Sequence, residues 1–210
     1  MSPRFPLPVS LKEVRNYVDG EFVATGKTFN NVSPIDGSVL APVHEADAAL
    51  VDRAVRAARR ALDEGPWGRS TVEERAAALH RVADIIARRF DEFLQAEVAD
   101  TGRPVEQARK LDVYRGIANF RTFADLGKSA HGEFFETHLP DGTQLINYTK
   151  RKPLGVVASI SPWNLPILSL TWKAAPALIC GNTIICKPSE ETPSSAVLIA
   201  EAFHEAGVPP

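Results

Sequence analysis

The stretch from residue 154 to residue 210 constrains the fold more than any other part of the chain. Residues 155–160 (GVVASI) and 182–186 (NTIIC) are short apolar runs bounded by turn residues, which is typical of strands covered on both faces of a parallel sheet. Between them, Pro166 stands where a first helical turn would begin, and residues 167–179 are apolar on nearly every side until Gly181. We therefore predict a buried helix between two parallel strands.

A second helix is predicted after the second strand. Thr192 can cap it, Pro193 can start it, and apolar residues recur at helical spacing as far as Gly207. The order strand, helix, strand, helix predicts a right-handed crossover, and such sheets bind ligands beyond the carboxyl ends of their strands. Two polar clusters follow these ends: Ser161, Pro162, Trp163 and Asn164 after the first strand, and Lys187, Ser189 and Glu190 after the second.

The composition excludes several classes of function. The chain has 210 residues, 44% hydrophobic residues and a formal net charge of −2, which suits a globular protein of one domain or two small ones. This charge balance provides no basic surface for nucleic acid. An uncharged apolar run of about 18 residues, as a membrane helix needs, is absent from the sequence. The start MSPRFP lacks the apolar core of a signal peptide, so we expect a cytoplasmic protein.

The cysteines and histidines carry no expected chemistry of their own. Cys180 and Cys186 both lie in apolar surroundings, so we expect buried, reduced side chains whose thiol pKa is raised, which is wrong for a nucleophile. The five histidines show no metal-ligand spacing, and we predict no metal site.

Before residue 127 the pattern is of hairpins followed by helices. Residues 1–15 are proline-rich and are expected to form an N-terminal arm. Residues 16–23 (NYVDGEFV) alternate around Asp19-Gly20, a strong two-residue hairpin signal, and residues 29–44 repeat the strand, turn, strand theme.

Helices are predicted from residue 47 onward. Residues 47–63 form an amphipathic pattern that ends at EGPWG. Residues 70–73 (STVE) have the spacing of a capping box and open a helical region through residue 99, with a break near residue 91. Pro104 is expected to start one more helix that runs to about residue 126.

The motifs at the strand ends recur together in one known family. The stretch ISPWNLPILSLTWKAAPALICGNTIICKPSEETP closely resembles the NAD(P)-dependent aldehyde dehydrogenases, in a Pro-Trp-Asn turn, a Trp-Lys pair, a Gly-Asn-Thr turn and a Lys-Pro-x-Glu-x-Thr-Pro segment. The resemblance covers nearly the whole chain from about Asn16. It implies an α/β fold: an incomplete, doubly wound parallel-sheet dinucleotide-binding domain with N-terminal β-hairpins and helices. The Gly-x-Gly-x-x-Gly fingerprint is absent, which fits this family.

The resemblance implies catalytic roles for two residues. Asn164 would donate its side-chain amide to the oxyanion that forms when a thiolate adds to the aldehyde, and Lys173 would lie near the reacting centre. Both have plainer alternatives. Asn164 would otherwise be a buried, satisfied residue of a packed loop, and the Lys173 side chain would otherwise extend out to solvent.

Cofactor contacts are implied at both strand ends. Lys187 and Glu190 would hydrogen-bond the adenosine ribose hydroxyls. An acidic residue at this position repels a 2′-phosphate, so NAD is favoured over NADP. The remaining cleft-lining residues would be Ile160, Ser161, Pro162, Trp163 and Ser189.

Local sequences also suggest a branch of the family. LDVYRG, ISPWNLP and KPSEETP look most like the dehydrogenases of 2-hydroxymuconic and 2-aminomuconic semialdehyde. The resemblance then implies that Arg115 grips the distant carboxylate of the substrate through its planar, bidentate guanidinium, with Trp172 as a further substrate contact. The alternative for Arg115 is a surface salt bridge.

Residues 127–153 and 154–210 complete the predicted organisation. By resemblance, residues 127–153 contribute to a projecting sheet for homo-oligomerisation, whereas residues 16–126 and 154–210 belong to the cofactor-binding domain. The family's nucleophilic cysteine and general base lie beyond the position of Pro210. We therefore expect an N-terminal fragment of an NAD-dependent dehydrogenase that is inactive alone. The alternative is a noncatalytic module that oligomerises or binds nucleotide weakly.

Overall fold

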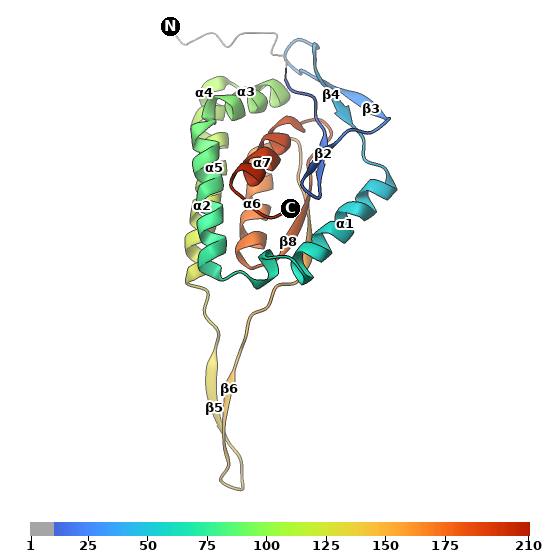
Figure 1. Ribbon diagram of the computed structural model, residues 1–210. Coiled ribbons are helices and arrows are strands. Elements are labelled where there is room, and N and C mark those ends of the chain that lie inside the picture. The colour runs from blue at the N-terminus through green and yellow to red at the C-terminus, as the bar shows by residue number, and fades with distance from the viewer. Residues whose placement is uncertain (1–10) are drawn as a thin grey trace.

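The computed structural model describes residues 11–210, so the first ten residues of the predicted arm lie outside the described part. Two hairpins open this part (Figure 1). Strands β1 (Asn16–Val18) and β2 (Glu21–Val23) pair antiparallel. Asp19 and Gly20 have φ of 56° and 81°, the left-handed pair that a two-residue turn requires. Strands β3 (Thr28–Val32) and β4 (Val39–His44) form the second hairpin. Both predicted hairpins are confirmed.

The first helices follow with one correction. Helix α1 (Ala48–Asp63) is capped by Asp47, and the 3-10 turn η1 (Trp67–Arg69) leads into α2 (Val72–Arg88). The capping box is made by Thr71 and Glu74, not by Ser70 and Glu73 as predicted. The reason is that the Ser70 hydroxyl donates to the Trp67 carbonyl at 2.6 Å and closes η1 instead.

The helical region then divides differently from the prediction. Helix α3 (Phe90–Thr101) begins after a break at Arg89. The single helix predicted from Pro104 consists of α4 (Val105–Gln107), a π-helical segment η2 (Ala108–Val113) and α5 (Tyr114–Lys128). A π-helical turn holds an extra residue. The segment places Asp112 and Val113 inside, while its Leu111 stays half-exposed.

A long hairpin and the predicted crossover complete the chain. Strands β5 (Phe134–His138) and β6 (Gln144–Tyr148) pair antiparallel and project as an arm away from the rest of the molecule (Figure 1). Strands β7 (Val156–Ile160) and β8 (Thr183–Lys187) pair in parallel around helix α6 (Pro166–Ile179), and α7 (Ser194–Glu205) follows. The predicted strand, helix, strand, helix order is confirmed.

Thr192 does not cap α7, contrary to the prediction. Its hydroxyl donates to the Trp163 carbonyl at 3.3 Å. The Ser194 backbone N–H at the start of α7 instead donates to a carboxylate oxygen of Asp100 on α3, at 2.9 Å. The first turn of α7 is therefore capped by the Asp100 side chain from α3.

The hydrophobic core lies between α2, α3, α5, α6 and α7. Its largest fully buried apolar side chains are Phe93, Phe120, Leu79, Ile86, Leu94, Ile167 and Ile199. Helices α5 and α6 approach closely at two glycines. A Cβ on Gly116 would lie 2.9 Å from Ile167 Cδ1, and one on Gly127 would lie 2.1 Å from Ile179 Cγ1. Across residues 11–210, no helix has the length and apolar character needed to cross a membrane.

Candidate active site

The two predicted polar clusters meet at one edge of the β7–β8 pair. Because the strands are parallel, their carboxyl ends lie together: Ile160 pairs with Lys187, and the Ser161 N–H donates to the Lys187 carbonyl at 3.1 Å. The turn after β7 therefore lies beside the loop after β8, at the edge where such sheets bind ligands.

Three side chains, one from α6 and two from loops, hold the carbonyls of the turn between β7 and α6, residues 160–166. Lys173 donates its Nζ to the Ile160 carbonyl, and Arg103 donates from Nη2 to the Asn164 carbonyl at 2.8 Å. The carbonyl between them, on Trp163, accepts from Thr192 as described above. The backbone of this turn is thus fixed at three of its carbonyl groups, which favours a preorganised site.

Glu97 holds the start of α6. Its Oε1 accepts from the Ile167 N–H at 3.1 Å, and its other carboxylate oxygen has no hydrogen-bond partner in the described part of the chain. Burial raises the pKa of Glu97 to about 8, and the nearby carboxylates of Asp112 and Asp100 act in the same direction. This side chain is therefore largely protonated at neutral pH.

Asp100 holds the start of α7 in the same way, by accepting a hydrogen bond from a backbone N–H. Besides the Ser194 N–H, its carboxylate accepts from the Ser194 hydroxyl at 2.9 Å and from the Asn31 amide at 2.8 Å. Burial raises the pKa of Asp100 to about 6. Helix α3 thus provides hydrogen-bond acceptors to the first turns of both helices that follow the parallel strands.

Asn164 is exposed, and within residues 11–210 its side-chain amide makes no hydrogen bond. The plainer alternative, a buried and satisfied asparagine, is therefore wrong. Ile160 and Trp163 are 64% and 62% exposed, and Pro162 is also exposed. Ser161 is buried, and among the described residues its hydroxyl has no partner.

The loop after β8 presents an ion pair. Lys187 Nζ lies 2.9 Å from Glu190 Oε2, both side chains are exposed, and this contact lowers the pKa of Glu190. Ser189 is buried and its hydroxyl accepts from the Glu191 N–H at 3.3 Å. Lys187 and Glu190 are thus accessible to a ligand, whereas Ser189 shapes the loop.

Arg115 and Trp172 lie on neighbouring, packed helices. Arg115 is exposed at the start of α5, and the described residues supply it with no ion-pair partner, so the alternative of a surface salt bridge gains no support. Trp172 on α6 is 51% exposed. No hydrogen bond in residues 11–210 joins either side chain to the turn.

The cysteines differ from each other. Cys186 is partly buried, and this burial raises the pKa of its thiol to about 12, so the raised pKa is as expected although the burial is incomplete. Cys180 is exposed, so its predicted burial is wrong. It follows the last residue of α6, where the helix leaves the core.

The sequence reasoning missed Glu97, Arg103 and Asp112, and it assigned Thr192 to the wrong partner. Glu97 and Asp100 do carry a sequence signal, because they interrupt the apolar face of α3 beside Ala96, Val98 and Ala99. Acidic residues at core positions need partners. Arg103 and Thr192 carried no such signal, because their partner carbonyls lie 61 and 29 residues away.

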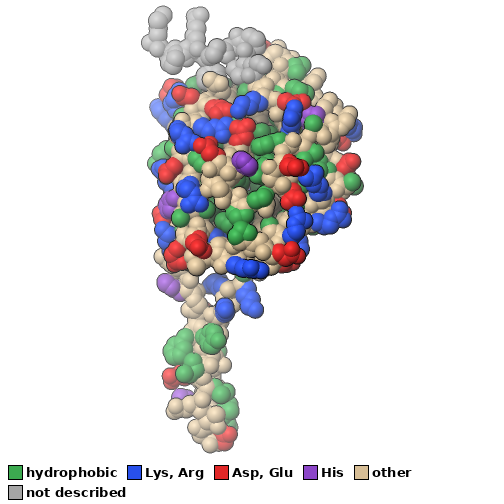
Figure 2. Space-filling view, viewed as in Figure 1, with side chains coloured by type: hydrophobic (Ala, Val, Ile, Leu, Met, Phe, Trp, Pro, Cys, Tyr) green, Lys and Arg blue, Asp and Glu red, His purple; other side chains and the backbone are tan. Residues whose placement is uncertain are grey.

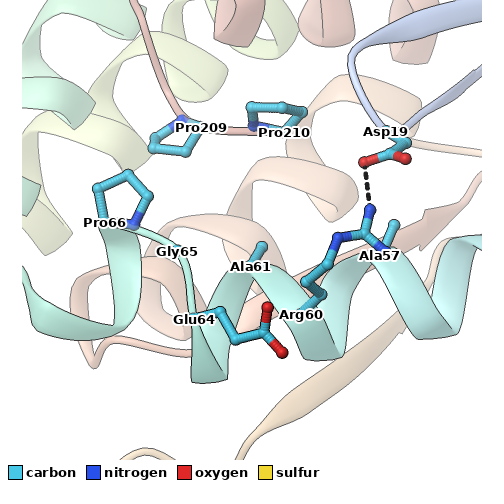
Figure 3. Close-up of a pocket in the computed structure, with 9 residues that line it drawn as sticks. All are labelled: Asp19, Ala57, Arg60, Ala61, Glu64, Gly65, Pro66, Pro209 and Pro210. Carbon is cyan, nitrogen blue, oxygen red and sulfur yellow. Dashed lines mark hydrogen bonds and ion pairs between the residues drawn. The ribbon is translucent and has the colours of Figure 1, made fainter.

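Two surface hollows lie away from the site. One, of about 290 Å³, lies between the β1–β2 turn, the end of α1 and the last two residues, and Arg60 bonds to Asp19 beside it at 2.7 Å (Figure 3). Residues 11–210 contain no group of three His, Cys, Asp or Glu side chains placed to hold a metal ion.

The chain matches one protein family over most of its length. The pattern of the aldehyde dehydrogenase family matches residues 22–210. The chain belongs to the aldehyde dehydrogenase family. It is 56% identical over 200 residues to 2-aminomuconic 6-semialdehyde dehydrogenase from Pseudomonas sp., covering 95% of this chain and 40% of the relative. It is 55% identical over 201 residues to 2-hydroxymuconic semialdehyde dehydrogenase from Pseudomonas sp. strain CF600, covering 95% and 41%.

Solved structures of the family show the same fold. The NAD+ complex of aldehyde dehydrogenase from Bacillus cereus superposes with a TM-score of 0.89 at 38% identity, covering 94% of this chain and 40% of that one. The chain therefore has the fold of part of an aldehyde dehydrogenase, and it spans about 40% of the length of the relatives that it matches.

Proposed function

We propose that this chain belongs to an NAD-dependent aldehyde dehydrogenase that oxidises a muconic-type semialdehyde to the carboxylic acid. The observation that carries the proposal is the exposed amide of Asn164, which makes no hydrogen bond within residues 11–210, on a turn whose backbone is held by Arg103 and Thr192. Identity of 55–56% to two dehydrogenases named for muconic semialdehydes supports the substrate class.

Asn164 has the role of oxyanion donor in this proposal. Attack of a thiolate on the aldehyde carbon places negative charge on the former carbonyl oxygen, and an amide fixed in advance stabilises that charge without reorganisation. Lys173, bound to the Ile160 carbonyl, contributes a positive charge at the same turn.

The nucleophile is not assigned to either cysteine of this chain. Cys186 holds its proton too tightly, with a pKa of about 12. Cys180 follows the C-terminal end of α6, about 20 Å along the helix from the turn. The thiolate and the general base therefore come from other parts of the enzyme.

The Lys187–Glu190 pair is suited to a dinucleotide. It offers an exposed donor and an exposed acceptor at the edge of the sheet, which matches the paired hydroxyls of a ribose, and the carboxylate disfavours a 2′-phosphate. When bound, NAD accepts hydride from the substrate. Ile160, Pro162 and Trp163 present apolar surface at the same edge, and Ser161 and Ser189 shape it from beneath.

Arg115 supplies the carboxylate grip on the substrate, and Trp172 an apolar contact. Arg115 has no ion-pair partner in residues 11–210, so its guanidinium is free for a bidentate contact with a carboxylate. A muconic semialdehyde carries such a carboxylate at the end opposite its aldehyde.

The enzyme is further proposed to be a cytoplasmic homo-oligomer. Residues 127–153 form the oligomerisation segment, because the arm exposes Phe134, Ile146 and Tyr148 by 65%, 69% and 75%. Hydrophobic side chains are visible along both sides of this arm (Figure 2). Residues 16–126 and 154–210 belong to the cofactor-binding domain.

The first experiment expresses the native gene, measures the intact mass, and assays NADH formation from 2-hydroxymuconic semialdehyde. A mass well above 22.9 kDa with NAD-dependent turnover is expected. A mass of 22.9 kDa without turnover would instead favour the noncatalytic module that oligomerises.

Asn164→Ala tests the central residue in the same enzyme. We expect kcat to fall by about 10²–10³-fold, as for loss of an oxyanion donor, with NAD affinity largely kept. Asn30→Ala, at an exposed position of β3, is the matched control and should leave kcat unchanged. Equal rates for both variants would refute the oxyanion role.

A further inference from the structure

Arg103 connects the turn to a buried carboxylate. One of its terminal nitrogens donates to the Asn164 carbonyl at 2.8 Å. The other terminal nitrogen, Nη1, lies 3.4 Å from Asp112 Oδ1, and Arg103 Nε lies 3.4 Å from Asp112 Oδ2. The Arg103 side chain is 22% exposed and that of Asp112 2%. All three guanidinium nitrogens of Arg103 thus contact either the Asn164 carbonyl or the Asp112 carboxylate.

Both ends of this connection are fixed by their own surroundings. Arg103 lies between Gly102, which ends α3 with φ of 68°, and Pro104, which restricts the preceding residue to extended backbone. Asp112 lies in the π-helical segment η2, whose extra residue turns it inward. The backbone at Arg103 is therefore restricted, and its guanidinium has a fixed partner in Asp112.

The orientation of Asn164 depends on its backbone. Because its side-chain amide makes no hydrogen bond in residues 11–210, no other group in that part of the chain sets its direction. Its carbonyl is held by Arg103, and this contact restrains the position of the adjoining Cα, to which the side chain is attached. A contact to the carbonyl therefore limits how far the backbone that carries the amide can move.

We propose that Arg103, held by Asp112, is a positioning residue that fixes the Asn164 turn and thereby aims the oxyanion donor. The oxyanion role of Asn164 in this inference rests on the proposed function. The restraint of the turn by Arg103 does not depend on that function. Lysine is a poor replacement, because a single ammonium lacks the planar fork that reaches Asp112 and the Asn164 carbonyl together.

The kinetic test uses the full-length enzyme with Arg103→Met, Arg103→Lys and Asn164→Ala. Arg103→Met should lower kcat about 10- to 100-fold, with KM for NAD changed less than about twofold, and Arg103→Lys should fall between it and the parent. Because Arg103 acts through Asn164, Arg103→Met should cost less than about twofold when Asn164 is already alanine. An equal cost in both backgrounds overturns the proposal.

A second measurement reports the turn directly. Amide hydrogen exchange of the peptide covering residues 161–170 should accelerate in Arg103→Met. Arg109→Met is the matched control, because Arg109 lies on η2 next to the Arg103 partner Asp112 but pairs with the exposed Asp91, at 3.6 Å. The control should leave both kcat and exchange unchanged, and identical behaviour of the two variants overturns the proposal.

The two proposals fail in different ways. If the parent enzyme oxidises no aldehyde, the proposed function falls, and the exchange comparison alone decides whether Arg103 holds the turn. If Arg103→Met does not fold, as judged by circular dichroism, Arg103→Lys takes its place in the cycle and in the exchange experiment with the same criteria.

Discussion

Three acidic side chains lie inside the molecule behind the turn, and each is compensated differently. Asp112 has a cation, Arg103, although burial still raises its pKa. Asp100 has three hydrogen-bond donors. Glu97 has one backbone donor, from α6, and a second oxygen without a partner in residues 11–210. Glu97 is therefore the group whose ionisation the fold tolerates least.

Glu97→Gln should change how stability depends on pH. The unfolded chain releases the Glu97 proton near the ordinary pKa of 4.5, whereas the folded chain keeps it up to about 8. The folded state thus binds more protons in this window, and the parent loses stability as pH rises through it. Glutamine stays neutral and still accepts from Ile167, so urea unfolding should show a flatter profile between about pH 4.5 and 8.

Glu92→Gln is the control for this profile. Glu92 lies on the same helix, but Arg89 lowers its pKa. Its contribution to stability is present above the ordinary pKa and is lost as pH falls, which is the opposite sign. The slope of unfolding free energy against pH above pH 5 decides the matter. If Glu97→Gln shows the same slope as Glu92→Gln, Glu97 is not the group that causes the loss of stability.

Arg115→Ala should separate substrates by charge. We expect KM to rise strongly for a semialdehyde that bears a distant carboxylate, and little for a simple aliphatic aldehyde, because only the first uses the guanidinium. Arg121→Ala is a suitable control, since Arg121 lies on the same helix and pairs with Asp84 at 2.8 Å. Steady-state kinetics with both substrates decide the matter, and an equal loss for both would remove Arg115 from the site.

At the scale of elements, the contact between α5 and α6 sets the position of the turn, because Gly116 allows Ile167 to lie against α5. A Cβ on Gly116 would approach both Cδ1 and Cγ1 of Ile167 at 2.9 Å. Gly116→Ala should therefore cost about 1–3 kcal/mol of unfolding free energy and lower kcat through the displaced start of α6. Gly26→Ala, which meets nothing within 4 Å, should change neither quantity.

The sequence predicted the elements better than their junctions. Strands β7 and β8, with α6 between them, were foreseen because Val156, Ile160 and their neighbours form apolar runs ended by turn residues. The α7 cap was misassigned to Thr192, since the actual acceptor, Asp100, lies 94 residues from Ser194. The π-helical segment was missed because the apolar pattern after Pro104 fits a regular helix, and nothing in it marks the contact between the inward-facing Asp112 and Arg103.

Considered as a whole molecule, the chain has one body and one projecting arm. An isolated two-stranded hairpin is marginally stable in water, and the strand pairing places Phe134, Ile146 and Tyr148 on the same face. We predict that a second copy covers this face. Ile146→Ser combined with Tyr148→Ser should lower the mass measured by light scattering.

A surface substitution outside the arm controls for general effects on solubility. Val51→Ser on α1 also removes a half-exposed apolar side chain, but it should leave the assembly intact. Dissociation by both sets of changes, or by neither, would argue against an interface formed by the arm.

The carboxylates of α3 also bear on how the chain reaches its native state. Glu97 and Asp100 bond to groups 70 and 94 residues further along, so during synthesis α3 leaves the ribosome long before its partners exist. Loop closure over such distances is slow. Until residues 154–210 arrive, these two acids remain hydrated, and the core beneath them stays incomplete. The helices of the parallel sheet and the N-terminal helical layer should thus become protected from exchange in a single late step.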